Sequence, residues 1–382
     1  DIPYDHQAWC DVLAQGVGYH TLALDVALGI LRLKGHRPEA WHRIAVQLVE
    51  ALRTGQGFND LQIPDGDREH HVERVLAYSY ERMDAVAQER FRLLGAMAEG
   101  ASWATEHIAQ LWQCDEPTAL DQMDALVNAA LLSRAEQHDD RWQQHNLLRG
   151  YALALLRRAG AAEAARAQHA AIYAAAMQQA DDAQHHHTML PDYPQVRHAV
   201  AWAIANDCAR AQRLIDNAAN LQAAFGFAHE GLAWSLQALN EAQQRGTSMN
   251  LAIAQITVGT ALQRVASLAG EDRGVRLREA LAAHEAALEW DRLNTAPFAF
   301  AIIQTNRGNV LRDLASVAGE DRAARLRAAL ATYDAALVYQ YPDTAPLAYA
   351  SIQNNRGVIL SDLANLSGEE RGSHLRAALA AY

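Results

Sequence analysis

The chain has 382 residues, more than an ordinary domain of about 100–200 residues, so several hydrophobic cores or an extended stack are expected. Its formal charge is −12, with 33 Lys and Arg against 45 Asp and Glu, and Lys34 is the only lysine. A phosphate-binding loop of the G-x-x-x-x-G-K-[ST] type, a Schiff-base enzyme and a nucleic-acid binder are therefore disfavoured, because each needs lysines or a basic face.

The cysteines predict reduced thiols. Cys10, Cys114 and Cys208 are odd in number and far apart, so they fit neither a disulfide framework nor a C-x-x-C zinc site. No apolar run approaches the ~18 residues of a membrane-spanning helix, and no signal peptide opens the sequence. We therefore expect a cytoplasmic protein with no membrane partner. Because the sequence starts at Asp1 and stops within a repeat, we also expect it to be a piece of a longer protein.

The first third of the chain shows a series of helical patterns. From Asp5 to Leu33 the spacing of apolar residues predicts two helices around a turn, and residues 18–24 at this turn read GYHTLAL. Residues 72–83, and two segments within 90–112, resemble the first three helices of a winged-helix domain. This part of the chain is therefore expected to be mostly helical.

A helix and two strands are predicted next. Acidic residues and Pro117 suit the first turn of a helix that begins at Asp115, since a helix N-terminus favours negative charge and needs no N–H from proline. Residues 131–134 and 141–144 predict two strands around a turn at 137–140. Directly after them, residues 144–152 read QHNLLRGYA.

In this order, the segments resemble signal-transduction ATPases with numerous domains (STAND), a group that includes plant NB-ARC resistance proteins, apoptotic ATPases and bacterial regulators. Residues 18–24 are similar to the G-Y-H-P-L-A-L turn of bacterial members, with Thr21 at the proline that borders the adenine. Residues 144–152 are similar to the M-H-D segment, with Gln144 and Asn146 at the methionine and the aspartate.

The resemblance implies an architecture and a nucleotide. It places the helical part of an NB-ARC-like module at 1–66 and a winged-helix domain at 67–155. In the family, the histidine of the M-H-D segment hydrogen-bonds the β-phosphate of ADP and holds the winged helix on the nucleotide-binding domain. By resemblance, His145 would make this contact, and the nucleotide-contacting turn would supply Gly18, His20 and Thr21.

The same resemblance implies a switch. The ADP site would be completed by the protein's own nucleotide-binding domain, which lies outside this sequence. Exchange of ADP for ATP would release the closed state and allow the protein to oligomerise. The alternative reading of His145 is a partly buried histidine at a strand end with no role in sensing.

The predicted winged helix does not favour DNA as a partner. The helix that would enter the major groove spans about 116–130, and the stretch from Asp115 to Ser133 contains no arginine or lysine. Its charged residues are Asp115, Glu116, Asp121 and Asp124. Because phosphate contacts supply most of the affinity for DNA, this surface favours docking within the protein instead.

Residues 156–250 are alanine-rich and predict a helical arm. Its helices are expected at 161–180, 195–206, 209–224 and 231–244. The triplet His185–His187 is expected in a loop between two of them. A metal site is disfavoured there, because three successive side chains point in different directions.

Residues 251–382 contain three copies of one pattern, offset by 49 residues. The offset relates Gln255, Gln304 and Gln353; Gly259, Gly308 and Gly357; and Gly270, Gly319 and Gly368. Each copy predicts two amphipathic helices, at 297–317 and 321–339 in the second copy. A helical hairpin cannot bury its apolar face alone, so the copies are expected to stack into a solenoid.

The repeats resemble tetratricopeptide repeats (TPR). Residues 306–311, NRGNVL, are similar to the signature of the first helix, and residues 329–337, ALATYDAAL, to that of the second. The period is 49 residues instead of about 34, which implies longer helices and loops. The resemblance implies a superhelix that binds a protein or peptide on its concave face.

Polar residues of the first helices are the candidate contacts for an inducer, a protein or an extended peptide. These residues are Gln255, Gln304, Gln353, Asn306, Asn355, Arg307 and Arg356. Recurring amides on a concave face could bond a peptide backbone. Equally, they could bond the neighbouring repeat, and the sequence leaves both possibilities open.

Together, these patterns predict a mainly α chain: a helical remnant, a winged helix with a small β wing, a helical arm and a TPR-like α-solenoid at 251–382. The chain lacks a P-loop, so we expect no catalytic activity of its own and an ATPase switch in the parent protein. Its expected role is the regulatory and sensor portion of a STAND protein. The alternative is a TPR scaffold or co-chaperone-like interaction module with no nucleotide role.

Overall fold

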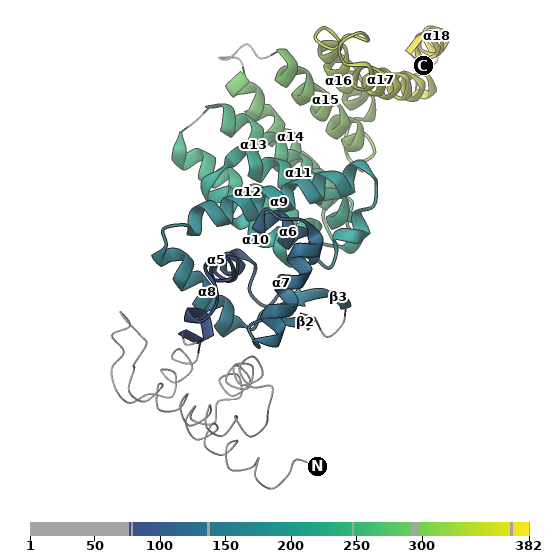
Figure 1. Ribbon diagram of the computed structural model, residues 1–382. Coiled ribbons are helices and arrows are strands. Elements are labelled where there is room, and N and C mark those ends of the chain that lie inside the picture. The colour runs from purple at the N-terminus through teal and green to yellow at the C-terminus, as the bar shows by residue number, and fades with distance from the viewer. Residues whose placement is uncertain are drawn as a thin grey trace, which may run out of the picture. The chain divides into compact units, whose positions relative to one another are not determined.

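The computed structural model describes residues 76–77, 79–135, 138–246, 248–291, 297–366 and 370–381. These residues fall into two compact units (Figure 1). The first contains the described residues up to Ala176 together with Thr188–Ala199, and the second contains Met177–His187 and the described residues from Val200 onward. The predicted segment 1–66, with Gly18, His20 and Thr21, lies outside the described residues.

The predicted fold class is confirmed: the described chain is mainly α, with a small sheet and a series of helical hairpins. The first unit begins with short helices interrupted by three short strands. In chain order these are α5 (Ala85–Leu93), the short 3-10 helix η1 (Leu94–Ala96), β1 (Ser102–Ala104), α6 (Thr105–Trp112), α7 (Glu116–Asn128), β2 (Ser133–Ala135), β3 (His138–Gln143) and α8 (Asn146–Arg158). The strands pair antiparallel in the order β1-β3-β2.

Local chemistry explains the boundaries of the helices in this unit. Asp115 caps α7, because its Oδ1 accepts a hydrogen bond from the backbone N–H of Thr118 at 2.7 Å, and Pro117 occupies the first turn. Gln113 ends α6 in the left-handed conformation with φ of 54°. The helix start predicted at Asp115 is therefore found where the sequence placed it.

The sheet differs from the two wing strands predicted by the sequence. Strand β1 was not anticipated, and three residues are too few to show an alternating pattern. It pairs Trp103 with Trp142 of β3, and both indoles are buried. The turn predicted at 137–140 is wrong in extent, because β3 already begins at His138.

Helices α9 (Ala162–Asp182) and α10 (Tyr193–Asn206) correspond to two helices of the predicted arm. The boundary between the two units falls within each of these helices, after Ala176 in α9 and after Ala199 in α10. Between them lies η2 (His186–Met189), so part of the histidine triplet is in a 3-10 turn and not in an open loop.

A buried ion pair joins the sheet to the start of α10 within the first unit. The guanidinium of Arg141 donates two hydrogen bonds to the carboxylate of Asp192, at 3.0 and 2.6 Å, and a third to Ser102 Oγ at 2.9 Å. Burial alone would raise the pKa of Asp192, but the interactions with His107 and Arg141 bring it below its usual value. The pair is nearly excluded from water, so loss of either partner would leave an uncompensated charge.

A buried histidine extends this polar network. His169 on α9 lies 2.9 Å through Nε2 from Oε1 of Gln195, and the same Oε1 accepts the backbone N–H of Ala98 at 2.8 Å. Because this oxygen has no hydrogen to donate, the neutral imidazole carries its proton on Nε2. The ring also packs against Tyr173, with centroids 4.7 Å apart. These contacts hold α9 and α10 against the loop that precedes β1.

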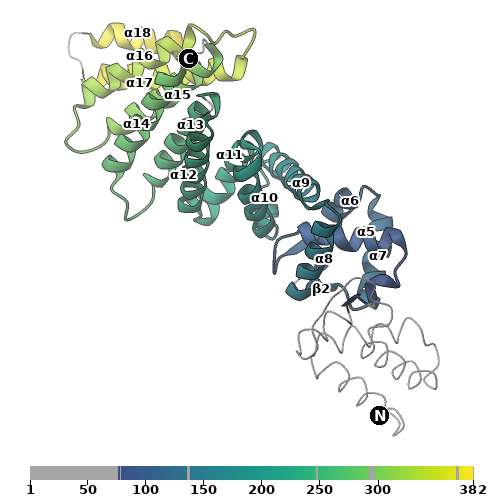
Figure 2. The same cartoon turned by 90° about the vertical axis from the view of Figure 1, so that its left-hand side faces the viewer.

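The second unit is a series of helices joined by short connections (Figure 2). They are α11 (Cys208–Phe225), α12 (Ala228–Arg245), α13 (Ser248–Val265), α14 (Arg273–Asp291), α15 (Pro297–Leu314), α16 (Arg322–Leu337), α17 (Pro346–Leu366) and α18 (Arg371–Ala381). Each helix packs on the next, and the 49-residue repeats form the hairpins α13–α14, α15–α16 and α17–α18. The predicted helices at 297–317 and 321–339 correspond to α15 and α16.

The repeated glycine of each first helix is explained by a ring of the second helix. A Cβ built on Gly259 would lie 2.5 Å from the His284 ring, and one built on Gly308 would lie 2.6 Å from the Tyr333 ring. His284 and Tyr333 are themselves 49 residues apart. The glycine therefore allows two helices to approach so closely that a buried ring fills the space of the missing side chain.

The turns inside the hairpins also repeat. Gly270 and Gly319 adopt the left-handed conformation, with φ of 89° and 86°. Asp272 and Asp321 then cap the second helices, since each Oδ1 accepts a backbone N–H three residues later at 3.0 Å. A glycine and a capping aspartate thus fix both ends of the connection.

We expect Gly308→Ala to lower the free energy of unfolding by about 1–3 kcal/mol, because the added methyl group would overlap Tyr333 and Thr332. Gly372→Ala is the matched control, since nothing lies within 4 Å of a Cβ on Gly372 in α18. Its stability should be unchanged or slightly higher. Urea unfolding followed by circular dichroism measures both. Equal stability changes in the two variants would contradict the close-approach explanation.

The buried histidines predict acid sensitivity of the first unit. Burial lowers the pKa of His169 to about 3 and that of His198 to about 4, against about 6.5 in the unfolded chain. Below pH 6.5 the unfolded chain therefore takes up protons that the folded chain does not bind. The free energy of unfolding should fall as the pH drops from 6.5 towards 4, by about 1.4 kcal/mol per pH unit for the fully buried His169.

Urea unfolding followed by tryptophan fluorescence between pH 7.5 and 4.5 tests this expectation. His169→Gln should flatten the pH dependence, because the amide does not titrate. His187→Gln, at an exposed histidine, is the control and should leave the slope unchanged. A slope that is the same in His169→Gln as in the unaltered chain would show that His169 does not carry the effect.

Candidate functional site

His145 lies two residues after β3, at the start of α8. Its Nδ1 accepts a hydrogen bond from the backbone N–H of Leu147 at 3.2 Å, so the imidazole caps the helix. The neutral ring therefore carries its proton on Nε2. The side chain is exposed and not partly buried, unlike the alternative reading of a buried strand-end histidine. An N–H donor at an exposed helix N-terminus is suited to an anion.

Residues on either side of His145 are hydrogen-bonded to other segments of the first unit. Gln144 is buried, and its Nε2 lies 3.4 Å from the carbonyl oxygen of Leu131. Arg149, one turn further along α8, donates through Nε to the carbonyl oxygen of Met97 at 2.9 Å. Burial lowers the pKa of Arg149, which nevertheless remains far above neutral pH. A cation thus lies on the first turn of α8, close in sequence to His145.

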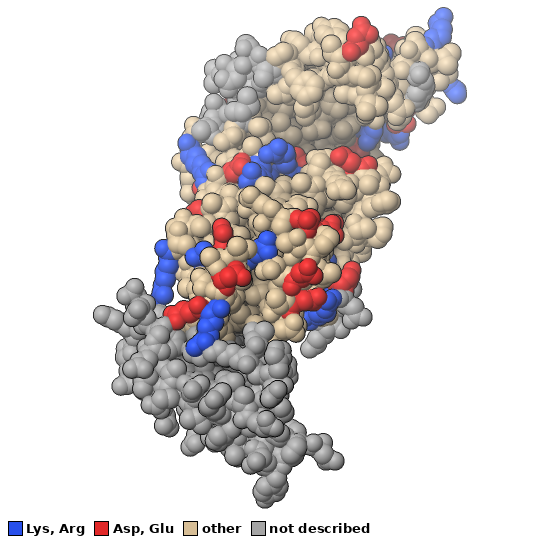
Figure 3. All heavy atoms as spheres, in the orientation of Figure 1, with Lys and Arg blue, Asp and Glu red and all other residues tan. Residues whose placement is uncertain are grey.

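The surface of α7 keeps the acidic character that the sequence showed. Arg134 of β2 pairs with Asp124 at 3.0 Å, and its guanidinium also covers the Trp142 ring at 4.2 Å. On the face of the described chain shown in Figure 3, arginines and carboxylates are interspersed and do not form a continuous basic area. This distribution does not favour contact with nucleic-acid phosphates.

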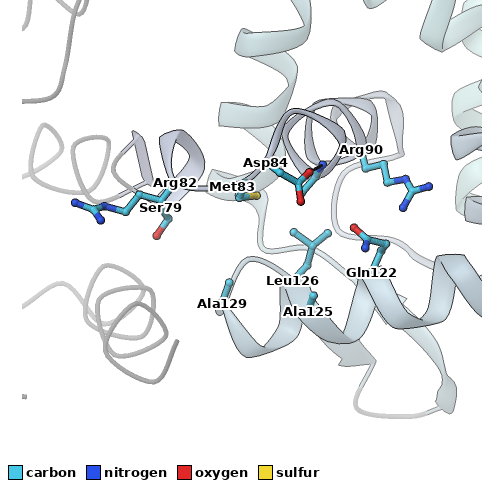
Figure 4. Close-up of a pocket in the computed structure, with 10 residues that line it drawn as sticks. Ser79, Arg82, Met83, Asp84, Arg90, Gln122, Ala125, Leu126 and Ala129 are labelled. Carbon is cyan, nitrogen blue, oxygen red and sulfur yellow. Dashed lines mark hydrogen bonds between the residues drawn. The ribbon is translucent and has the colours of Figure 1, made fainter. Parts of the chain in front are cut away.

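A cavity of about 450 Å³ lies between α5 and α7 (Figure 4). Its apolar lining comes from Met83 just before α5, Ala87 within α5, Ala125 and Leu126 of α7, and Ala129 directly after α7. The volume is in the usual range of small-molecule pockets. Sequence reasoning missed this cavity, because small residues on two separate helices give no motif.

The candidate glutamines of the repeats lie in different environments. Gln304 is buried, and its Oε1 accepts a hydrogen bond from Arg307 at 2.9 Å. Gln353 is half-buried and donates through Nε2 to the Tyr349 hydroxyl at 2.9 Å. Gln255 is also half-buried. The equivalent amides therefore do not form one uniform exposed row.

The candidate asparagines lie on consecutive first helices. Asn355 donates to Asn309 Oδ1 at 3.2 Å and accepts from Arg312 at 3.2 Å, and both partners belong to the preceding repeat. Asn306 is half-buried on α15. The contacts of Asn355 fit the alternative in which recurring amides bond the neighbouring repeat.

The candidate arginines form a repeated ion pair. Arg307 lies 3.2 Å from Glu285, and Arg356 lies 2.7 Å from Asp334. Both members of the pair shift by 49 residues from one repeat to the next. Each arginine thus neutralises a carboxylate on the second helix of the preceding repeat.

Large apolar side chains are exposed on the same first helices. Ile253 and Ile302 occupy equivalent positions and are 36% and 39% exposed. Phe298 and Leu347 occupy a second pair of equivalent positions and are 59% and 87% exposed. Phe298 and Ile302 are four residues apart and share a face of α15. We call these four residues the apolar row; sequence reasoning missed it because it considered only polar positions.

Comparisons with known proteins add little to this geometry. No family model and no curated protein matches the sequence. Among solved structures, the chain is similar to a signal transduction ATPase with numerous domains (STAND) protein with a tetratricopeptide repeat sensor from Pyrococcus horikoshii. The identity is 9% and the TM-score 0.23, over 95% of this chain and 68% of that chain. Within the described residues, none of the helices has the length and apolarity needed to cross a membrane.

Proposed function

We propose that this chain is the regulatory and sensor portion of a STAND signal-transduction ATPase. In this proposal the winged-helix domain gates exchange of ADP for ATP and oligomerisation, and the repeats bind an inducer or a protein. The P-loop and the ATPase activity would belong to a nucleotide-binding domain outside this sequence. The chain itself would therefore not be catalytic.

The observation that carries the proposal is the state of His145. Its Nδ1 is occupied by the cap of α8, so Nε2–H is the donor that remains on an exposed ring. Donation of this N–H to a phosphate oxygen would give a charge-assisted hydrogen bond. Such a contact would favour the closed state as long as ADP is bound, and its loss would shift the population towards the open state.

The sensor role is supported by the apolar row. The candidate cations Arg307 and Arg356 already pair with carboxylates, so they are poorly suited to hold an acidic partner as their main contact. The exposed apolar residues lie on the first helices of successive repeats, and burial of apolar side chains is the main favourable contribution when such a surface binds a protein segment. The proposed partner is therefore a protein segment with apolar side chains.

The nucleotide role predicts the behaviour of two His145 variants in the full-length protein. His145→Ala and His145→Ser should both lose bound ADP faster and become active without inducer, because alanine has no donor and the shorter serine side chain cannot place its hydroxyl where Nε2–H lies. The serine retains a cap for α8, so its stability should stay near that of the parent. ADP released from the purified protein is measured by chromatography. Retention of ADP and of inducer control in both variants would contradict the switch.

The sensor role predicts a different pair of variants. Peptides selected from a displayed random library on the unaltered chain should be rich in apolar residues. Ile302→Asp and Phe298→Asp should weaken their binding at least tenfold, about 1.4 kcal/mol. Leu236→Asp, at an exposed leucine of α12, is the control and should bind as before. Equal binding by all three variants would exclude the apolar row.

The two experiments also separate the proposal from the alternative of a plain TPR scaffold. The exposed apolar row alone would suffice for a scaffold, since it needs no nucleotide. Peptide binding that depends on the row, combined with His145 variants that behave as the parent, would favour the scaffold.

A further inference from the structure

Helix α18, the last of the series in the second unit (Figure 2), exposes two leucines. Leu375 and Leu379 are 46% and 79% exposed, and they share one face of the helix because they are four residues apart. Leu326 and Leu277 lie one and two offsets of 49 residues before Leu375, and each is only 1% exposed. The same position is thus buried in two repeats and exposed in the third.

The first helix of the next repeat is what covers this position in the first two repeats. Leu277 and Leu326 each belong to an apolar cluster that also contains two residues, four apart, of the following first helix. These pairs are Val310 and Leu314 on α15, and Ile359 and Leu363 on α17. The two pairs are themselves related by the offset of 49 residues, so the contact between repeats is the same at both places.

Ion pairs accompany the apolar contact between repeats. Arg322 on α16 lies 3.4 Å from Asp362 on α17. Arg278 on α14 lies 3.0 Å from Glu320, which follows α15 in the next repeat. Each second helix thus carries an arginine that meets a carboxylate of the repeat after it. At the positions of Arg322 and Arg278, α18 has Arg371 and Arg376.

The described residues contain no carboxylate partner for Arg371 or Arg376, and Arg376 donates to a backbone carbonyl of its own helix at 3.1 Å. We call Leu375, Leu379 and these two arginines the terminal face. It has the apolar and the cationic half of a contact between repeats. Two terminal faces would bring cations against cations, which disfavours a second copy of the chain as the occupant.

We propose that the terminal face binds the first helix of a further repeat of the same protein. That helix would place an aliphatic residue and a leucine, four residues apart, over Leu375 and Leu379, and an aspartate directly before this leucine would pair with Arg371. Residues 310–314, VLRDL, and 359–363, ILSDL, have this pattern. The terminal face is separate from His145 and from the apolar row, so the proposal stands or falls independently of the switch and sensor roles.

An extended chain tests the proposal. A second copy of residues 334–382 is joined after Tyr382, which occupies the position of Tyr333, so the copy continues the repeat in register. Leu375→Cys is introduced in the original α18 only, and its alkylation by iodoacetamide is followed by peptide mass spectrometry. The rate should be at least tenfold lower than in the unextended chain, because a thiol under a packed helix reacts only when the helix opens.

Ala380→Cys is the matched control. Ala380 is exposed on α18, and its equivalents Ala282 and Ala331 remain exposed although another repeat follows each of them. Its alkylation rate should therefore be the same with and without the extension. Equal rates for Leu375→Cys in the two chains would overturn the proposal, since the added repeat would then not cover the terminal face.

Substitutions within the added copy test the contact itself. There, Ile359→Asp should restore fast alkylation of Leu375→Cys, whereas Asn354→Asp, at an exposed position of α17, should leave the thiol protected. Circular dichroism checks that both copies keep their helices. Protection that persists with Ile359→Asp would overturn the proposed contact. Sedimentation of the unextended chain tests the other occupant: a dimer that Leu379→Asp dissociates would show that a second copy covers the terminal face, and would also overturn the proposal.

Discussion

The close approach of two helices at a glycine is the contact on which the repeat unit depends. At Gly259 and Gly308 the backbone of the first helix lies against a ring of the second, so neither position tolerates a side chain without displacement of that ring. This contact fixes the rotation of the first helix within each hairpin. Because the rotation is the same in successive repeats, Ile253 and Ile302 are exposed to similar extents. The surface available to a partner is thus a consequence of the packing at the glycine.

In the first unit, a buried polar network has the corresponding role. Gln195 of α10 accepts hydrogen bonds at one oxygen from His169 and from Ala98 N–H. The neighbouring Met97 carbonyl accepts a hydrogen bond from Arg149 of α8. A continuous set of hydrogen bonds and one peptide unit thus connects the arm helices with the helix that His145 caps. Burial keeps His169 neutral in this network, because it lowers the pKa of the residue to about 3.

The sequence predicted those features that repeat or that act locally. Helices α15 and α16 were predicted because their apolar spacing and the 49-residue offset can be recognised in the sequence. The cap at Asp115 was predicted because it involves residues only three apart. Strand β1 was missed, since its pairing with β3 bridges about forty residues. The burial of Gln304 and the cavity between α5 and α7 depend on which helices pack against each other. A single sequence does not reveal these contacts.

All of the Lys and Arg residues except Lys34 are arginines, and several of these arginines bind carboxylates within the chain. A guanidinium can donate two hydrogen bonds in a fixed geometry, which suits buried or inter-helix carboxylates better than an ammonium group. Arg141 does so with Asp192, and the repeats use Arg307 with Glu285 and Arg356 with Asp334. These guanidinium groups are therefore already used in contacts within the chain. In the proposed sensor role, the exposed apolar side chains of the repeats would then be the main contacts, which favours an apolar partner over an acidic one.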